Sequence, residues 1–253
     1  MNARRGIYLA PFEELSEPWV VAELAARAES RGWDGFFVWD HVRYRAPVEK
    51  VADPWITLAA VAVATERLAI GPMVTPVARR RPHQLARETV SLDRLSGGRL
   101  VLGVGLGSLR TGEFDPEVFG EEGDPRARAR LLDDGLERLA AYWGGEFEPR
   151  PLQEPRIPVW VASRWPNRRP LRRAARWDGL FPIDVPDPDA LAELAGEVRE
   201  LRDPGAEGPF DLVVTNPAGE SPEPWAQAGA TWCLTGFGPQ PTRAEVEAAI
   251  DAG

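Results

Sequence analysis

The chain has 253 residues and a formal net charge of −9, with 30 Lys and Arg against 39 Asp and Glu. Hydrophobic residues make up 43% of the chain, which is enough apolar material for a packed core. An acidic chain lacks the basic face that general nucleic-acid binding requires, so we expect no nucleic-acid partner.

The single cysteine, Cys233, excludes an intramolecular disulfide. One cysteine and two histidines are too few for a cysteine-rich or polyhistidine metal site, so we expect no metal. The chain has no apolar run of 18 residues and no charged-then-apolar leader. We therefore expect a cytoplasmic protein that does not associate with a membrane.

Short apolar runs alternate with amphipathic or helix-start segments along the whole chain. The expected strands cover residues 6–10, 35–39, 68–75, 100–107, 157–162, 179–183, 210–215 and 231–235. The expected helices cover residues 18–31, 55–64, 82–95, 125–143, 167–176, 189–201, 222–228 and 242–252. Such alternation predicts an α/β fold with a parallel sheet.

Eight strand-helix units are the count of a (β/α)8 TIM-like barrel, which typically has about 250 residues. We predict this fold as a single domain over residues 1–253. The alternative is a doubly wound open sheet, for which GVGLG could be the dinucleotide fingerprint. That fingerprint needs a further glycine at Ser108 and normally follows the first strand, which favours the barrel.

The stretch 92–108, LDRLSGGRLVLGVGLGS, ends a helix and forms the fourth expected strand. Its continuous apolar run is typical of a strand buried on both faces. Gly103, Gly105 and Gly107 stand at every second position, so one face of the strand carries no side chains. We expect something large to lie against that face.

Polar residues at the ends of barrel strands are the candidates for function, because barrel active sites lie at that end. His41 is the only histidine in such a position, and imidazole exchanges protons near neutral pH. Asp40 either orients His41 or points elsewhere. We take His41 and Asp40 as catalytic candidates; the alternative is that they only form the turn after the second strand.

The segment 163–173 carries five arginines and joins the fifth strand to a helix. Guanidinium groups and the amides of a helix N-terminus together bind anions, so the phosphate of a cofactor would fit there. Ser163, Arg164 and Asn167 are nearest the strand end and are our candidates for phosphate binding. The later arginines are expected on a solvated helix face.

Four segments carry a family resemblance: VWDH, MVTPVARRRPHQLARET, LDRLSGGRLVLGVGLG and RRAARWDGLFPI. Over roughly residues 6–183 the chain resembles the bacterial luciferase-like, flavin-dependent oxidoreductases. The resemblance implies a TIM-like barrel that uses FMN or a deazaflavin of the coenzyme F-420 type. It implies hydride transfer to, or monooxygenation of, a small organic substrate. It also implies a homodimer and, for an FMN enzyme, a separate flavin reductase.

In this family the glycine-rich strand and the third strand lie on either side of the cofactor ring. The resemblance therefore implies Gly71, Thr75, Gly105 and Gly107 as cofactor-binding residues. A cis peptide in the third strand would align near Gly71-Pro72. The chain has Leu106 where the luciferases have a phosphate-binding arginine, which leaves the phosphate to the loop after the fifth strand.

Deazaflavin-dependent relatives have an active-site histidine after the second strand, which aligns with His41. Two further hypotheses stay open. One is a flavin- or deazaflavin-binding carrier or sensor without its own chemistry. The other is a barrel enzyme of different chemistry that uses the arginine segment to bind a sugar phosphate.

Overall fold

A computed structural model describes residues 3–205 and 208–253. Within these residues the strands form one parallel sheet in the order β3-β2-β1-β9-β8-β7-β6-β5-β4. They are β1 (Arg4–Leu9), β2 (Gly35–Val38), β3 (Ala69–Pro72), β4 (Thr75–Pro76), β5 (Leu102–Gly105), β6 (Val159–Arg164), β7 (Gly179–Ile183), β8 (Asp211–Pro217) and β9 (Trp232–Gly236).

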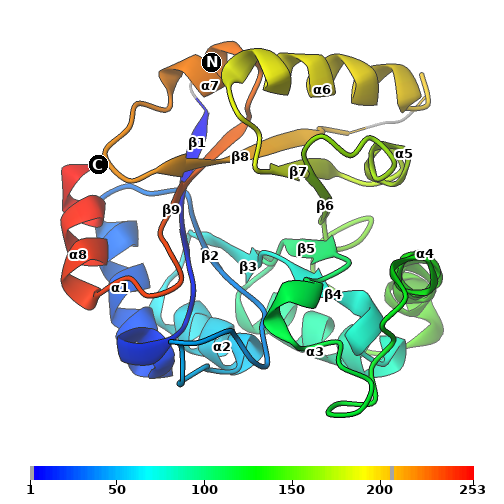
Figure 1. The fold of residues 1–253 in the computed structure, drawn as a ribbon, viewed down its shortest axis with the longest axis horizontal. Helices are drawn as coiled ribbons and strands as arrows, with labels where there is room; N and C mark the ends of the chain where they lie inside the picture. The colour runs from blue at the N-terminus through cyan, green and yellow to red at the C-terminus, as the bar shows by residue number, and fades with distance from the viewer. Residues whose placement is uncertain (1–2, 206–207) are drawn as a thin grey trace.

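The sheet curls round on itself until its two ends meet. β3 and β4 are separated by two residues and together occupy one position in the ring. Ile70 in β3 bridges Leu100 just before β5, and the amide of Val101 donates to the carbonyl of Ile70 at 2.8 Å. Figure 1 looks into this ring, with the helices outside it. The predicted TIM-like barrel is confirmed.

Helices surround the strands as an outer layer (Figure 1). They are α1 (Pro18–Ser30), α2 (Pro54–Ala64), α3 (Pro82–Leu95), α4 (Pro125–Ala141), α5 (Leu171–Ala174), α6 (Pro188–Leu201), α7 (Glu223–Gln227) and α8 (Arg243–Ala252). Short 3-10 helices are η1 (Glu13–Ser16), η2 (Val77–Arg79) and η3 (Leu109–Thr111), and a π-helical turn, η4 (Tyr142–Glu146), ends α4.

Capping residues fix where several helices begin. Asp53, Asp124 and Asp187 each accept hydrogen bonds from backbone amides of the first helical turn, and a proline follows each aspartate. Proline suits that position because its missing N–H would have no partner there. Thr242 starts α8 in a capping box with Glu245.

No helix among the described residues is long and apolar enough to cross a membrane.

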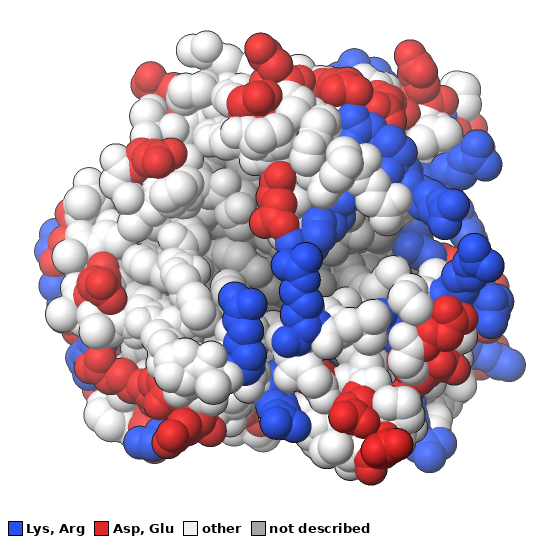
Figure 2. All heavy atoms as spheres, in the orientation of Figure 1, with Lys and Arg blue, Asp and Glu red and all other residues white. Residues whose placement is uncertain are grey.

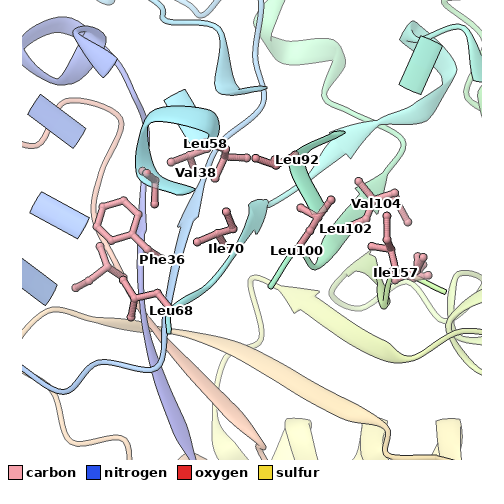
Figure 3. Close-up of a cluster of buried hydrophobic side chains, with 14 of the residues drawn as sticks. Phe36, Val38, Leu58, Leu68, Ile70, Leu92, Leu100, Leu102, Val104 and Ile157 are labelled. Carbon is pink, nitrogen blue, oxygen red and sulfur yellow. The ribbon is translucent and has the colours of Figure 1, made fainter. Parts of the chain in front are cut away.

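Two apolar layers hold the barrel together. The first lies between strands and helices, where side chains of β2, β3 and β5 meet Leu58 of α2 and Leu92 of α3 (Figure 3). The second fills the barrel interior and consists of Phe37, Met73, Val101, Trp160, Phe181, Val213, Trp232 and Leu234. A filled interior leaves the open ends of the barrel as the places for a ligand.

The bare face of the glycine-rich strand is covered by the chain itself. A Cβ on Gly103 would lie 2.4 Å from both the Met73 sulfur and the Pro72 carbonyl oxygen, and one on Gly105 would lie 2.8 Å from Val74 Cγ2. The large feature expected against this face is therefore the third barrel strand, which is interrupted at Met73 and Val74 between β3 and β4. Its cis peptide joins Met73 and Val74, so the predicted position at Gly71-Pro72 is wrong.

The helix predicted over residues 167–176 is also shorter than expected, because α5 starts only at Leu171. Pro170 lies inside the predicted range, and proline both lacks an N–H and disfavours helical geometry in the preceding residue. The segment between Arg164 and Pro170 is therefore a loop.

Candidate active site at the mouth of the barrel

His41 pairs with a carboxylate from a distant loop. Its Nδ1 lies 2.7 Å from Oε2 of Glu113, which stands in the long loop between β5 and α4. The Glu113 side chain is 0% exposed and that of His41 is 17% exposed. An ionised carboxylate only accepts hydrogen bonds, so Nδ1 carries a proton and Nε2 is left to exchange one.

Glu113 is held ionised by a full set of donors. The Val42 amide and the Thr111 hydroxyl donate to it at 2.7 Å each, and Arg79 donates through Nη1. Burial alone would raise the pKa of Glu113, but the His41 hydrogen bond, with smaller contributions from the His41 and Arg79 charges and from Thr111, lowers it to about 2. The carboxylate is therefore a fixed negative charge behind His41.

The carboxylate of Asp40 bonds to two arginines and a threonine, so it is not the hydrogen-bond partner of His41 Nδ1. It accepts hydrogen bonds from Arg79, from Arg80 at 2.9 Å and from the Thr75 hydroxyl at 2.8 Å. Arg79 thus bridges Asp40 and Glu113, and its side chain is only 5% exposed. This buried network fixes the end of β2 and the beginning of β4 against the loop that carries Glu113.

Aromatic rings surround His41. The ring centroids of Phe12, Trp39 and Tyr44 lie 5.9, 5.9 and 5.2 Å from that of His41. Tyr8 lies 5.8 Å from Trp39 and donates its hydroxyl to the Met73 carbonyl at 3.0 Å. Burial, followed by the nearby Tyr44 hydroxyl, raises the pKa of Tyr8, so its hydroxyl stays protonated.

The site has an apolar floor. Val74, Ala162 and Ile183 are half-buried against the interior core and stand at or near the carboxyl ends of β3, β6 and β7, the same end of the barrel as His41 after β2. Trp39 adds a buried indole N–H that has no hydrogen-bond partner among the described residues. Figure 2 shows a hollow at the centre of this view, where Figure 1 shows the ring of strands, with Lys and Arg side chains beside it. Apolar side chains with one unsatisfied donor fit a planar ring that carries polar edges.

The end of β6 and the loop after it hold the residues expected to bind phosphate. Ser163 is buried and donates its hydroxyl to the Asn167 carbonyl at 2.8 Å. Arg164 is exposed and paired with Asp184, which follows β7. Asn167 is exposed, and its side chain accepts from the Arg169 amide at 3.1 Å. Ser163 and Arg164 are thus the last residues of β6, and Asn167 lies in the loop that follows.

The remaining predicted cofactor residues lie in and after the third and fourth barrel strands. A Cβ on Gly71 would lie 1.9 Å from the Val101 carbonyl oxygen, so Gly71 is needed for strand packing. Gly107 has a φ of +70°, and a Cβ there would lie 2.4 Å from Cε2 of Phe114. Thr75 belongs to the Asp40 network. The space beside each of these glycines is filled by protein, and contact with a cofactor stays a prediction.

Sequence reasoning missed Glu113, Arg79 and Arg80. The available signal was weak: a long loop with charged residues follows the glycine-rich strand, and ARRR follows the third strand. Neither pattern indicates which distant residue each charged side chain contacts.

Within the described residues, no cluster of three or more His, Cys, Asp or Glu side chains could hold a metal ion.

Known proteins similar to this chain include both deazaflavin and flavin enzymes. An F420-dependent glucose-6-phosphate dehydrogenase of Nakamurella multipartita is 36% identical over 143 residues, which are 55% of this chain and 40% of that protein. The oxygenase component of a flavin-dependent trigonelline monooxygenase of Acinetobacter baylyi is 30% identical over 115 residues, which are 40% of this chain and 31% of that protein. The chain spans less than half the length of these relatives.

Solved structures share the fold at lower sequence identity. An F420-dependent secondary alcohol dehydrogenase in complex with an F420-acetone adduct has a TM-score of 0.78 and 19% identity, covering 99% of this chain and 97% of that one. An FMN-bound Baeyer-Villiger monooxygenase component of Pseudomonas putida has a TM-score of 0.67 and 17% identity, covering 85% and 67%. The model of the luciferase-like monooxygenases matches residues 14–218, and the chain belongs to this family.

Proposed function

We propose that this protein is an oxidoreductase that binds FMN or a deazaflavin coenzyme at the mouth of the barrel and acts on a small organic substrate. The observation that carries the proposal is the His41–Glu113 pair beside the apolar floor of Val74, Ala162 and Ile183. The oxidised coenzyme would accept the hydride in a dehydrogenation, or the reduced coenzyme would supply the reducing power for monooxygenation. The protein would supply binding, orientation and proton transfer.

Each group in the site has a role in this proposal. Glu113 holds the Nδ1 proton of His41 and orients the ring. Nε2 of His41 would be free to exchange a proton with a bound substrate. Asp40 acts through Arg79, which it helps to hold against Glu113. Val74 and Ala162 would lie against the ring face and exclude water from it.

The coenzyme-binding set combines the ring contacts with the predicted phosphate loop. Ser163 and Arg164 end β6 and Asn167 lies in the loop after it, where the phosphate would lie. Similar proteins include F420-dependent dehydrogenases, a flavin-dependent monooxygenase component and an FMN-bound one, which supports both coenzymes. A proton-exchanging histidine fits hydride transfer best, because that reaction moves a proton with the hydride.

The proposal is tested by titrating the purified protein with FMN and with coenzyme F420 while absorbance and fluorescence are recorded. We expect saturable binding of one of them. Binding of neither would refute the proposal. Binding without oxidation or reduction by any substrate or reductant would favour the carrier or sensor hypothesis.

Replacing His41 separates binding from chemistry. We expect His41→Ala to keep coenzyme affinity within about twofold and to lower turnover by about 10²–10⁴-fold, the usual contribution of a general acid or base. His83→Ala is the matched control, because His83 is exposed in the first turn of α3. Loss of coenzyme binding with unchanged turnover would contradict the role of His41.

Partners and location complete the proposal. Ile56 and Val63 on α2 are 63% and 72% exposed, and apolar side chains on an outer helix support a homodimer. A flavin reductase is a partner only if the coenzyme is FMN, as the oxygenase component of the trigonelline enzyme suggests. We propose a cytoplasmic location. Sedimentation of wild type and Val63→Glu at equal concentration tests the dimer.

A further inference from the structure

Arginines stand on both loops that meet beside His41 at the mouth of the barrel. Arg43 and Arg45 follow His41 in the loop after β2, and Arg110 belongs to η3 in the loop after β5. All three arginines are exposed. Among residues 3–205 and 208–253, their side chains have neither an ion pair nor a hydrogen bond.

Contacts between the two loops bring two of these arginines to the same side of the site. The Val42 amide donates to Glu113 at 2.7 Å, and a Cβ on Gly112 would lie 3.9 Å from Nη1 of Arg43. Arg110 stands two residues before Gly112, in the turn that Gly112 ends. The guanidinium of Arg43 therefore lies against the backbone that leads into Glu113.

The third arginine, Arg45, lies on the aromatic side of the site. Its guanidinium carbon is 5.8 Å from the centroid of the Tyr44 ring, and that ring is 5.2 Å from the ring of His41. Val42 and Leu109, each next in sequence to one of the other two arginines, are exposed as well. The mouth therefore offers positive charge and apolar surface around a ring that can exchange a proton.

The carboxylates near these loops are already engaged elsewhere. Asp115, Glu122 and Asp124, in the loop that follows η3, accept backbone amides of their own turns. The buried Asp40 and Glu113 are occupied by the network beneath His41. Figure 2 shows basic side chains standing over the central hollow. In a chain with a net charge of −9, such a local positive potential concentrates anions at the site.

We propose that the substrate is a small organic anion, a carboxylate or a phosphate ester, whose charged group is held by Arg43 and Arg110 with Arg45 beside them. This inference rests on the proposed function and names the substrate class of the same site. Arginine suits the task because its planar guanidinium donates two parallel hydrogen bonds to a carboxylate or a phosphate. A substrate held in this way would have its uncharged part beside His41.

The test uses three aromatic probes: benzoate and phenyl phosphate as anions, and benzyl alcohol as their neutral counterpart. The chain has only two histidines, so the His41 ring signals in a proton NMR spectrum can be assigned with His83→Ala. Each probe is titrated into the protein saturated with the coenzyme that binds, and the shift of the His41 signals gives its dissociation constant. We expect both anions to bind about tenfold more tightly than benzyl alcohol, and the difference to shrink at high salt.

Arg43→Met and Arg110→Met should each weaken binding of the anions by about three- to tenfold, the effect of losing a partly exposed charged contact. Binding of benzyl alcohol should stay within about twofold. Arg199→Met is the matched control, since Arg199 is exposed on α6 in the outer layer, and it should change none of the constants. Equal binding of the charged and neutral probes by wild type, or no binding of either anion, would overturn the inference.

The coenzymes are anions too, so their dissociation constants are measured in the same variants. We expect these constants to stay within about twofold of wild type. A loss of coenzyme binding as large as the loss of anion binding would assign the arginines to the coenzyme and overturn the inference. If wild type binds neither FMN nor coenzyme F420, the proposed function fails, whereas coenzyme binding without a preference for the anionic probes refutes this inference alone.

Discussion

Glu113→Gln tests whether a buried charge at the site contributes to both stability and chemistry. The substitution keeps the size of the side chain and removes its negative charge. It also brings an amide NH₂ group among donors from His41, Thr111, Val42 and Arg79. At least one of these donors then loses its acceptor, and Arg79 keeps only Asp40 as a carboxylate partner.

The magnitude follows from the pKa of Glu113, which falls from 4.5 to about 2 on folding. Each pH unit of this difference is worth about 1.4 kcal/mol, so ionisation of Glu113 contributes on the order of 3 kcal/mol to the free energy of unfolding. Because the folded pKa is the lower one, this contribution is complete above pH 4.5. It is lost as the pH falls from 4.5 towards 2.

The assay is urea unfolding of wild type and Glu113→Gln at pH 7 and at pH 3. We expect the variant to be less stable at pH 7 by about 3 kcal/mol, and the gap to shrink to less than half at pH 3. Comparing the two proteins cancels the titration of all other groups that they share. An equal gap at both pH values would refute the assignment of Glu113 as a buried carboxylate held ionised by its donors.

Other substitutions test the packing that builds the site. Gly103→Ala would bring a Cβ to 2.4 Å from Met73 and Pro72, and we expect a loss of about 1–3 kcal/mol in urea unfolding. Gly196→Ala should instead stabilise the protein, because Gly196 lies in α6 and a Cβ there would meet open space. Thermal unfolding should show a free energy of unfolding higher by up to about 1 kcal/mol. Arg99 donates to four carbonyl oxygens and one hydroxyl near the ends of α2 and α3. Arg99→Met should therefore cost at least about 2 kcal/mol by the same unfolding measurement, and Arg99→Lys should not restore it; stability equal to wild type in Arg99→Met would contradict this.

The fold could be predicted because buried parallel strands leave a clear pattern in the sequence. The strand expected over residues 179–183 has the same bounds as β7, and most expected helices start within one residue of the observed ones. Apolar runs and capping residues act locally, so a single sequence carries them. The start of the expected helix over residues 167–176 was wrong, since Pro170 delays the helix to Leu171 although its neighbours favour helix.

The candidate site could be predicted only in part. His41 was found from its position after a strand, which is a local feature. Its partner Glu113 lies 72 residues away in the sequence, and no local pattern distinguishes it from the other acids of its loop. Asp40 was the obvious neighbour, yet strand geometry directs its side chain to Arg79 and Arg80. The bare face of Gly103 and Gly105 was recognised, but its occupant depends on the three-dimensional course of the third strand.

The most direct test of the account is an experimental structure of the protein with bound FMN or coenzyme F420, whichever binds. We predict that the ring lies at the mouth of the barrel against Val74 and Ala162, on the side where His41 and Glu113 stand. A ring bound elsewhere, such as the surface groove between α1 and α8, would contradict the account.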